Sequence, residues 1–179
     1  EGKPDHIEDF SAVGYHPKHH QSNHIWRGTK ADIYEGGHRV PLLVRWPSSI
    51  KAGSVSDHTT TLTDWYATIS ELVDHRMTDG EGEDSFSLVP LLKGDGTWQR
   101  APVINHSING MFAIRDGKWK LVRYGKTGHE SKLYPWELFD MEKDRSETEN
   151  LVKKYPEKVE ELEAKWEQWA VRARVKPWP

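Results

Sequence analysis

The stretch RGTKADIYEGGHRVP gathers residues that could bind an anion. Lys30, Arg27 and Arg39 bring positive charge around the adjacent glycines Gly36 and Gly37. A glycine pair permits a close backbone approach or a positive φ, and a cationic turn of this kind suits sulfate or phosphate. A lead-in to a strand with ordinary solvated charges would look the same. The local chemistry leaves both interpretations open.

Four histidines form a second cluster, and they could bind a transition metal. His16, His19, His20 and His24 have spacings that would place them on one face of a helix, an arrangement that can hold zinc. Pro17 lies inside the cluster, the surroundings are polar, and no carboxylate is included. An exposed histidine-rich loop that binds metal only incidentally is therefore favoured.

Two later polar segments could also carry chemistry. Residues 105–109 (NHSIN) follow an expected strand end, where polar side chains can reach a cleft, although a plain turn between strands fits as well. Residues 140–150 are acidic but lack the glycine and the spacing of an EF-hand loop. A solvated turn before the last helix is the expectation for this second segment.

The elements that would position these residues can be read from hydrophobic patterning. Residues 39–46 (RVPLLVRW) form a short apolar run, which predicts a strand buried on both faces within a parallel sheet. Residues 61–73 repeat apolar side chains at helical spacing, which predicts an amphipathic helix. Thr61 and Asp64 resemble a capping box at its start. A short apolar piece, 85–93, follows a loop rich in glycine and acidic residues.

The C-terminal half predicts a small antiparallel sheet and a helix. Strands are expected at 101–104 and 137–140, with a hairpin between them formed by two runs that flank an Asp-Gly turn at Gly117. A terminal helix should begin at Pro156. Its apolar stripe should pack on the sheet; the stripe comprises Val159, Leu162, Trp166, Trp169 and Ala173.

The composition of the 179 residues limits the possible functions. The net charge is -3, so no broad basic field exists for nucleic acid or an anionic membrane. No apolar run is long enough to span a bilayer. The chain has no cysteine, which excludes disulfides, Cys-ligated zinc and a cysteine-derived nucleophile within it. It starts without methionine or a recognisable leader, so we expect an internal cut.

Five ordered motifs closely resemble those of the sulfatase family. The first is K-x-x-x-[YW]-E-G-G-x-R-V-P, which begins here at Lys30 and runs into W-P. The others are the D-x-x-x-T helix at Asp64, the G-x-S-x-x-P-x-L-x-G segment at 82–94, the I-R-x-G-x-x-K-L hairpin at 114–121, and the E-L-Y-D-L-x-x-D-P-x-E-x-x-N-L segment at 137–151. Together they cover most of residues 27–151.

The resemblance implies roles for particular residues. Lys30 occupies the position of the family's lysine that contacts the sulfate and helps the ester oxygen leave, and it is the catalytic candidate. His106 is the candidate for a substrate-binding group supplied by the C-terminal sheet. Arg39 is expected to brace the turn. The family's formylglycine nucleophile arises in a C/S-x-P-x-R motif, and its calcium site uses aspartates and an Asp-Asn-Gly; neither motif occurs here.

The resemblance also implies an architecture. The fold would be the α/β alkaline-phosphatase-like sulfatase fold, with residues 1–95 ending the catalytic domain and residues 96–179 forming an antiparallel-sheet subdomain with its helix. The parent would hydrolyse an aryl or carbohydrate sulfate in the periplasm or outside the cell, with calcium and formylglycine supplied upstream and no metal ligand here. This chain alone would be inactive. A phosphoryl hydrolase of the same fold, or a non-catalytic sugar- or metal-binding module, remain the alternatives.

Overall fold

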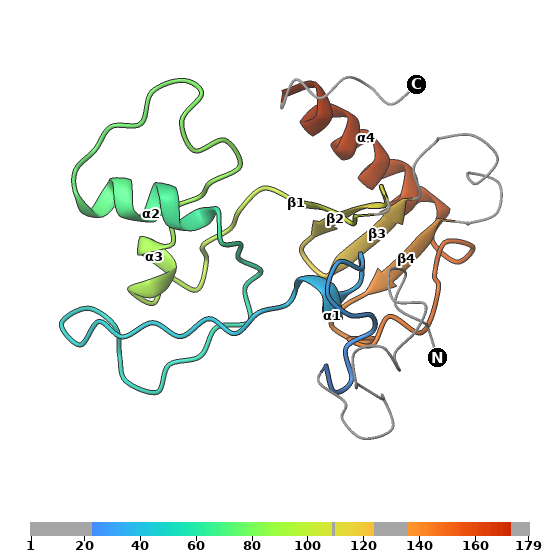
Figure 1. The fold of residues 1–179 in the computed structure, drawn as a ribbon, viewed down its shortest axis with the longest axis horizontal. Helices are drawn as coiled ribbons and strands as arrows, with labels where there is room; N and C mark the ends of the chain where they lie inside the picture. Colours follow the sequence, from blue (N-terminus) through green and yellow to red (C-terminus); the bar gives the residue numbers. More distant parts are fainter. Residues whose placement is uncertain (1–22, 109, 124–135, 173–179) are drawn as a thin grey trace, which may run out of the picture. The chain divides into compact units, whose positions relative to one another are not determined.

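The structure is a computed structural model that describes residues 23–108, 110–123 and 136–172 (Figure 1). The chain divides into two compact units. One comprises Glu1–Val40 with Ile104–Pro179, and the other comprises Pro41–Val103. The domain boundary expected at residue 95 stays a prediction. Among the described residues, no helix has the length and apolar character needed to cross a bilayer.

The first unit contains a four-stranded sheet whose strands lie in chain order, β1-β2-β3-β4. The hairpin and the strand before the last helix are confirmed. Asp116 pairs with Trp119, and Gly117 between them has φ 52°, at the turn position where a glycine is needed. Both the β2–β3 and the β3–β4 pairings are antiparallel. The strands are β1 (Val103–His106), β2 (Phe112–Asp116), β3 (Trp119–Arg123) and β4 (Glu137–Asp140). The first strand starts two residues later than expected.

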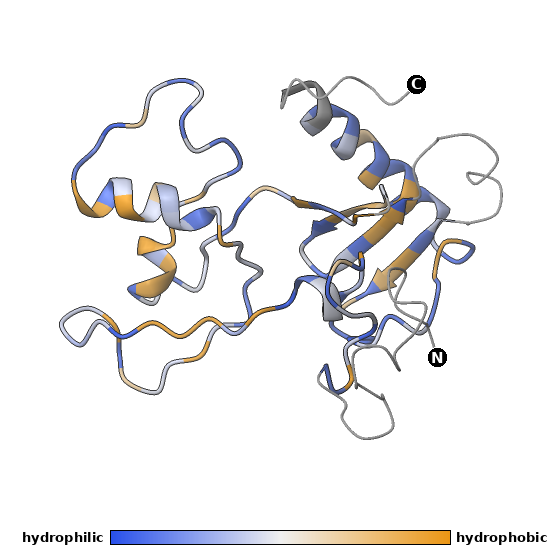
Figure 2. Ribbon diagram, in the orientation of Figure 1, coloured by the Kyte–Doolittle hydropathy of each residue, from blue (hydrophilic) through white to orange (hydrophobic). Residues whose placement is uncertain are grey.

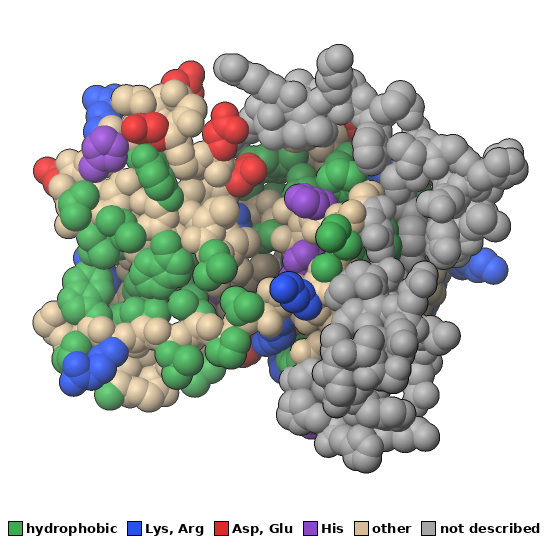
Figure 3. Space-filling model, viewed as in Figure 1, with side chains coloured by type: hydrophobic (Ala, Val, Ile, Leu, Met, Phe, Trp, Pro, Cys, Tyr) green, Lys and Arg blue, Asp and Glu red, His purple; other side chains and the backbone are tan. Residues whose placement is uncertain are grey.

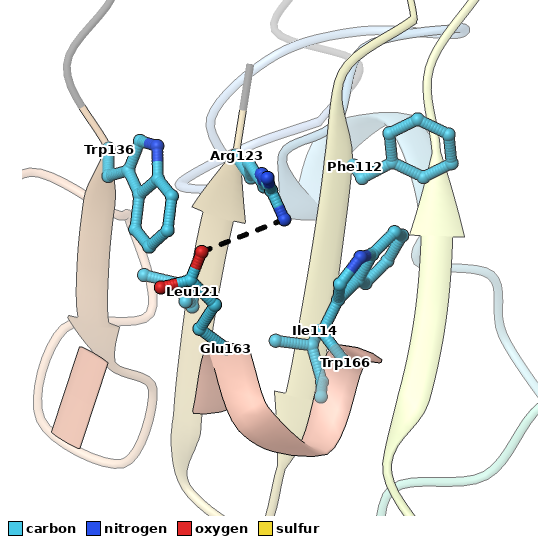
Figure 4. A pocket seen from close by; sticks show the side chains of 7 residues that line it. All are labelled: Phe112, Ile114, Leu121, Arg123, Trp136, Glu163 and Trp166. Atoms are coloured by element: carbon cyan, nitrogen blue, oxygen red, sulfur yellow. Dashed lines mark ion pairs between the residues drawn. The ribbon is translucent and has the colours of Figure 1, made fainter. Parts of the chain in front are cut away.

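The final helix, α4 (Pro156–Arg172), covers one face of this sheet through Val159, Leu162 and Trp166, as predicted; Ala173 of the predicted stripe lies outside the described residues. Trp166 packs edge-on against Phe112 with ring centroids 4.9 Å apart. Figure 4 shows Trp166 beside Ile114, and it shows the ion pair that joins Glu163 of the helix to Arg123 of β3, whose closest nitrogen and oxygen are 3.9 Å apart. The cluster beneath the helix has as its most buried members Ile114, Leu121, Leu138, Leu151 and Leu162.

The opposite face of the sheet is covered by residues that precede the first helix. Alternate strand positions point to opposite faces, so the neighbours of the helix-facing residues form a second cluster. It contains Ile33, Tyr34, Met111, Ala113, Val122, Phe139 and Met141. Figure 2 shows the hydrophobic positions of β3 and β4 that feed both clusters. The segment around Ile33 and the adjoining α1 (Glu35–His38) are thereby fixed to the sheet.

The second unit contains α2 (Asp64–Leu72) and the short α3 (Val89–Leu92). The expected helix is confirmed, and its capping box is half formed, because the Asp64 carboxylate accepts the Thr61 N–H at 2.8 Å. The face of the helix that packs within the described chain is not the apolar one. The polar and small face packs inward, with Asp64 and Thr68 fully buried, while Leu62 and Ile69 are exposed. Polar groups prevail because Asp64 and Thr68 bind backbone groups of the segment that leads into α3.

The prediction of a buried parallel strand at 39–46 is wrong. Residues 39–46 have no regular secondary structure, and Leu43 is 89% exposed. A strand apolar on both faces needs a neighbouring strand on each side and covering layers. The described part of the chain supplies no strand beside this segment. Figure 3 shows hydrophobic side chains gathered on the surface of this unit.

Candidate functional site

Lys30 lies on a compact loop that Asp32 holds together. The Thr29 N–H donates to Asp32 Oδ2 at 2.6 Å, and the Asp32 N–H donates to the Thr29 carbonyl at 3.0 Å. Asp32 is buried, whereas Lys30 is exposed. The next residue, Ala31, has φ 81°, a left-handed conformation that is uncommon for a residue with a Cβ. The backbone is therefore tightly determined, and it presents an ammonium group to solvent.

The glycine pair closes this loop by packing directly against it. A Cβ on Gly36 would lie 2.2 Å from the Gly28 carbonyl oxygen, and one on Gly37 would lie 2.2 Å from that of Asp32. The Gly36 N–H donates to the Arg27 carbonyl at 2.7 Å. Neither Gly36 nor Gly37 has a positive φ. Of the two roles that the sequence suggested for the pair, close approach is the one found.

Arg27 fastens the start of the loop to the sheet. Its guanidinium lies over the Tyr34 ring, 3.6 Å from the centroid, and donates to the Tyr34 hydroxyl at 2.9 Å. It also donates to Glu137 Oε1 at 3.2 Å and to the Glu147 carbonyl at 2.9 Å. The Tyr34 hydroxyl donates to Glu137 Oε2 at 2.6 Å. Arg27 therefore serves the framework of the loop, with both terminal nitrogens of its guanidinium engaged by the protein.

A buried charge cluster lies beneath α1. The Lys120 ammonium is 3.2 Å from Glu35 Oε1 and 2.6 Å from Glu147 Oε1, and Lys120 is 1% exposed. Burial raises the pKa of Glu147 above its ordinary value. Burial also acts on Glu35, but Lys120, with Arg115 and Arg39, lowers the pKa of that carboxyl below its ordinary value. Two carboxyl groups that share one ammonium are expected to diverge in this way.

His106, the second candidate, ends β1 and is exposed. Its ring lies near Phe112, with centroids 6.1 Å apart. The following turn is fixed by Ser107, whose N–H donates to the Met111 carbonyl at 2.8 Å and whose hydroxyl accepts the Met111 N–H. The Ile108 N–H reaches the carbonyl of Ala31 at 3.4 Å. The loop that carries Lys30 thus contacts the turn that follows His106.

His38 is a further site residue that the sequence reasoning did not single out. Its Nε2 atom is buried and has no hydrogen-bond partner among the described residues. Burial, followed by the charge of Lys120, lowers the pKa of His38 below its ordinary value. The charges of Glu35 and His106 also act on it. Its position directly after the glycine pair was the only available sequence signal.

The arrangement suits binding of an anion at the solvent-facing edge of this unit. Within the described part of the chain, the Lys30 ammonium makes no hydrogen bond or ion pair, so its three donors are available. Arg39 braces the turn, as expected: its side chain pairs with Glu35 at 3.5 Å and lies over the Trp26 ring. A fixed loop thus offers a cation that is unpaired among the described residues, and this loop contacts the turn that follows the exposed His106.

The residues described here do not fit a metal ion. No group of three or more His, Asp or Glu side chains that could hold one occurs among them. Of the histidine cluster, His24 is exposed with φ 48°, and His16, His19 and His20 lie outside the described residues, as does Asn109. The described residues therefore cannot assemble a calcium site, and the sequence has no C/S-x-P-x-R motif that could yield formylglycine.

Curated relatives of this chain are sulfatases. It is 29% identical over 147 residues to an N-acetylgalactosamine-6-O-sulfatase of Bacteroides thetaiotaomicron, which covers 77% of this chain and 28% of that protein. It is 38% identical over 89 residues to the steryl-sulfatase of Homo sapiens, covering 50% of this chain and 15% of that protein. The chain therefore spans less than a third of the length of these relatives.

The fold of this chain also resembles solved structures. A Bacteroides thetaiotaomicron structure from a study of glycosaminoglycan metabolism superimposes with a TM-score of 0.71 and 27% identity, covering 81% of this chain and 32% of that chain. Ps i-CgsB in complex with k-i-k-neocarrahexaose superimposes with a TM-score of 0.68 and 25% identity, covering 81% and 32%. The predicted α/β sulfatase fold class is confirmed, with its small antiparallel sheet and C-terminal helix.

Fold and sequence thus define the C-terminal region of a sulfatase. The model of the family described as N-sulphoglucosamine sulphohydrolase, C-terminal, matches residues 23–174, and the chain belongs to that family.

Proposed function

We propose that this chain is the C-terminal part of a sulfuric ester hydrolase, and that it supplies one cation to the active site. The observation that carries the proposal is the exposed ammonium of Lys30, unpaired within the described part of the chain and held on a loop with a tightly determined backbone. A sulfate monoester carries negative charge on oxygens that an ammonium can approach. A preformed cation needs little rearrangement during the reaction.

In this proposal, Lys30 acts on the oxygen that leaves. Hydrolysis breaks the S–O bond, and the bonding electron pair moves onto the ester oxygen. An ammonium group beside that oxygen stabilises the developing negative charge and can donate a proton to it. Lys30 is therefore the catalytic residue that we assign to this chain.

His106 would contact the substrate from the adjoining turn. Its ring is exposed, and the turn that follows it is tied to the Lys30 loop through Ile108 and Ala31. An imidazole here can donate to or accept from a hydroxyl of the alcohol part of the substrate. Because solved relatives include one in complex with k-i-k-neocarrahexaose, a sulfated carbohydrate is the substrate class that we favour.

We place the remaining chemistry of the site elsewhere in the complete sulfatase. Calcium and a formylglycine nucleophile would come from the preceding part, because no cluster of described residues could hold a metal ion and the sequence contains no C/S-x-P-x-R motif. That same part would cover the apolar side chains of residues 39–46 and of α2. An extracytoplasmic location, periplasmic or secreted, is proposed from the family.

The test replaces Lys30 with alanine in the complete sulfatase and measures turnover of a chromogenic aryl sulfate. Loss of one stabilising donor should lower kcat by about 100- to 1,000-fold. The control is Lys153→Ala, since Lys153 is an exposed lysine of the same unit in the turn before α4. Unchanged turnover in Lys30→Ala would refute the assigned role.

The same preparation separates the alternatives. A phosphoryl hydrolase would turn over the matching aryl phosphate faster than the aryl sulfate, because both leaving groups are equal and only the transferred group differs. A non-catalytic module would turn over neither ester and would still bind glycan or zinc in equilibrium dialysis. Preference for the sulfate ester, with dependence on Lys30, is the result expected.

A further inference from the structure

Glu147 is an unusual residue for a surface turn. It lies in the acidic segment between β4 and α4, which the sequence predicts to be solvated, yet it is 0% exposed. Its φ is 54°, a left-handed conformation that non-glycine residues adopt only at a cost. A buried carboxylate on a strained backbone persists only where its surroundings determine it strongly. Its contacts therefore call for an explanation.

Those contacts join both ends of the segment that carries Lys30. The Glu147 carbonyl accepts the Arg27 guanidinium at 2.9 Å, at the start of the segment. Its Oε2 atom accepts the Glu35 N–H at 2.7 Å, at the end of the segment. One residue thus contacts two points of the chain on either side of the loop.

Lys120, a residue of β3, holds the Glu147 side chain in place. The Lys120 ammonium approaches Glu147 Oε1 to 2.6 Å, outside hydrogen-bond alignment, so the contact is an ion pair. Lys120 is the second residue of β3, which is hydrogen-bonded on both sides to neighbouring strands. The Glu147 side chain is therefore anchored to a strand that is paired on both sides.

Stability alone does not explain this arrangement. A buried ion pair is often no more stabilising than well-packed apolar side chains of the same volume, because both charges lose their hydration. An apolar pair could not fix the orientation of the loop, since it has no atom that accepts the Glu35 N–H. The geometry of this cluster favours a positioning role for the loop above it.

We propose that Glu147 is a positioning residue for Lys30: it fixes both ends of the Lys30 loop to the sheet, and so sets where the ammonium meets the sulfate ester. The proposal rests on the proposed function, in which Lys30 acts on the leaving oxygen. Misplacement of a reacting group by about 1 Å can cost roughly 100-fold in rate. Loss of the Glu147 side-chain contacts should therefore reduce turnover without any direct contact between Glu147 and substrate.

The first measurement needs no activity. Hydrogen exchange, followed by mass spectrometry on the full chain, compares Glu147→Ala with the parent. Exchange should rise within residues 27–37, above all at Glu35, whose N–H loses its acceptor, whereas the Arg27 bond to the Glu147 carbonyl survives the substitution. Exchange should stay unchanged in the hairpin 112–123. The matched control is Glu149→Ala, because Glu149 lies in the same turn with its side chain exposed. Equal protection of residues 27–37 in parent and Glu147→Ala would overturn the proposal.

The second measurement is a double-mutant cycle with Lys30→Ala in the complete sulfatase. Glu147→Ala should lower kcat by about 100-fold when Lys30 is present and should add little when Lys30 is absent, because the two act through one group. A general folding defect would instead lower kcat equally in both backgrounds, and that additive result would overturn the inference. Glu147→Gln keeps an acceptor for the Glu35 N–H, so it should lose less activity than Glu147→Ala.

The turnover of the two variants distinguishes failure of the proposed function from failure of the positioning inference. If Lys30→Ala alone keeps full turnover, the proposed function fails and the positioning inference fails with it. If Lys30→Ala loses turnover while Glu147→Ala keeps it, only the positioning inference fails.

Discussion

Replacing Gly36 with alanine should disrupt the loop that carries Lys30. The new Cβ would lie 2.2 Å from the Gly28 carbonyl oxygen and 2.6 Å from that of Arg27, and real Cβ contacts below 3.0 Å are essentially never seen. Both obstacles are backbone atoms, so no side-chain rotation relieves the overlap. Forced overpacking costs ~1–3 kcal/mol. Stretching the Gly36–Arg27 hydrogen bond adds about 1 kcal/mol. We expect a loss of about 2–4 kcal/mol in unfolding free energy.

Urea unfolding, followed by tryptophan fluorescence, measures this loss, since the chain has nine tryptophans. The matched control is Gly96→Ala. A Cβ at Gly96 meets no atom within 4 Å, and Gly96 does not have a positive φ. That variant should be unchanged or more stable by up to ~1 kcal/mol, because alanine restricts the unfolded chain. If Gly36→Ala unfolds at the same urea concentration as the parent, the close packing assigned to the glycine pair is incorrect.

Three further predictions concern stability. Arg100→Met leaves the buried Asp64 carboxylate without the cation now 3.1 Å away, and it should cost about 3–5 kcal/mol in urea unfolding. Arg39→Met breaks an exposed pair and should cost about 1 kcal/mol or less, so similar losses in both variants would contradict the burial argument. Leu162→Ala removes a fully buried side chain between α4 and the sheet and should cost about 2–5 kcal/mol by the same measurement, a value that a loosely packed helix would not reach. Burial lowers the pKa of His38 below 6.5, so the unfolded state binds its proton more readily; the resulting stability is present above pH 6.5 and is lost as the pH falls below it. A pH series of unfolding midpoints should therefore show a flatter acid slope for His38→Gln, and an unchanged slope would contradict this assignment.

The sheet and α4 were predictable because their signals are local. The Asp-Gly turn at Gly117 fixes the hairpin register by itself, and alternation along each strand defines two faces. The terminal helix carries its own start at Pro156 and its own apolar stripe. Each of these elements finds its packing partner within the described chain.

The elements of the second unit were harder to predict, because their apolar surfaces lack partners here. Residues 39–46 have the composition of a central strand, but no described strand runs beside them. In α2, the buried carboxylate of Asp64 and the hydroxyl of Thr68 decide which face turns inward. Hydrophobic periodicity identifies the helix, but it does not show which face packs against the rest of the described chain.

The motif of the candidate site could be predicted from the sequence, but the residues that hold its loop in place could not. Lys30 and the glycine pair stand out through their fixed spacing, and close packing was among the roles expected for the glycines. Glu147 falls on the fixed Glu of the D-P-x-E-x-x-N-L motif, but its burial could not be predicted, because an acidic run usually means a solvated turn. Its burial depends on Lys120, which lies far away in the chain and meets it only through the register of the sheet.

The uncovered apolar side chains of the second unit have a practical consequence for anyone who produces this chain. Leu43 and Val55 are 89% and 90% exposed, and Leu62 and Val73 are each at least two-thirds exposed. Surfaces of this kind cause reversible self-association and attract chaperones during expression. Purification of the isolated chain is therefore best planned at low protein concentration and moderate salt, with light scattering at each step.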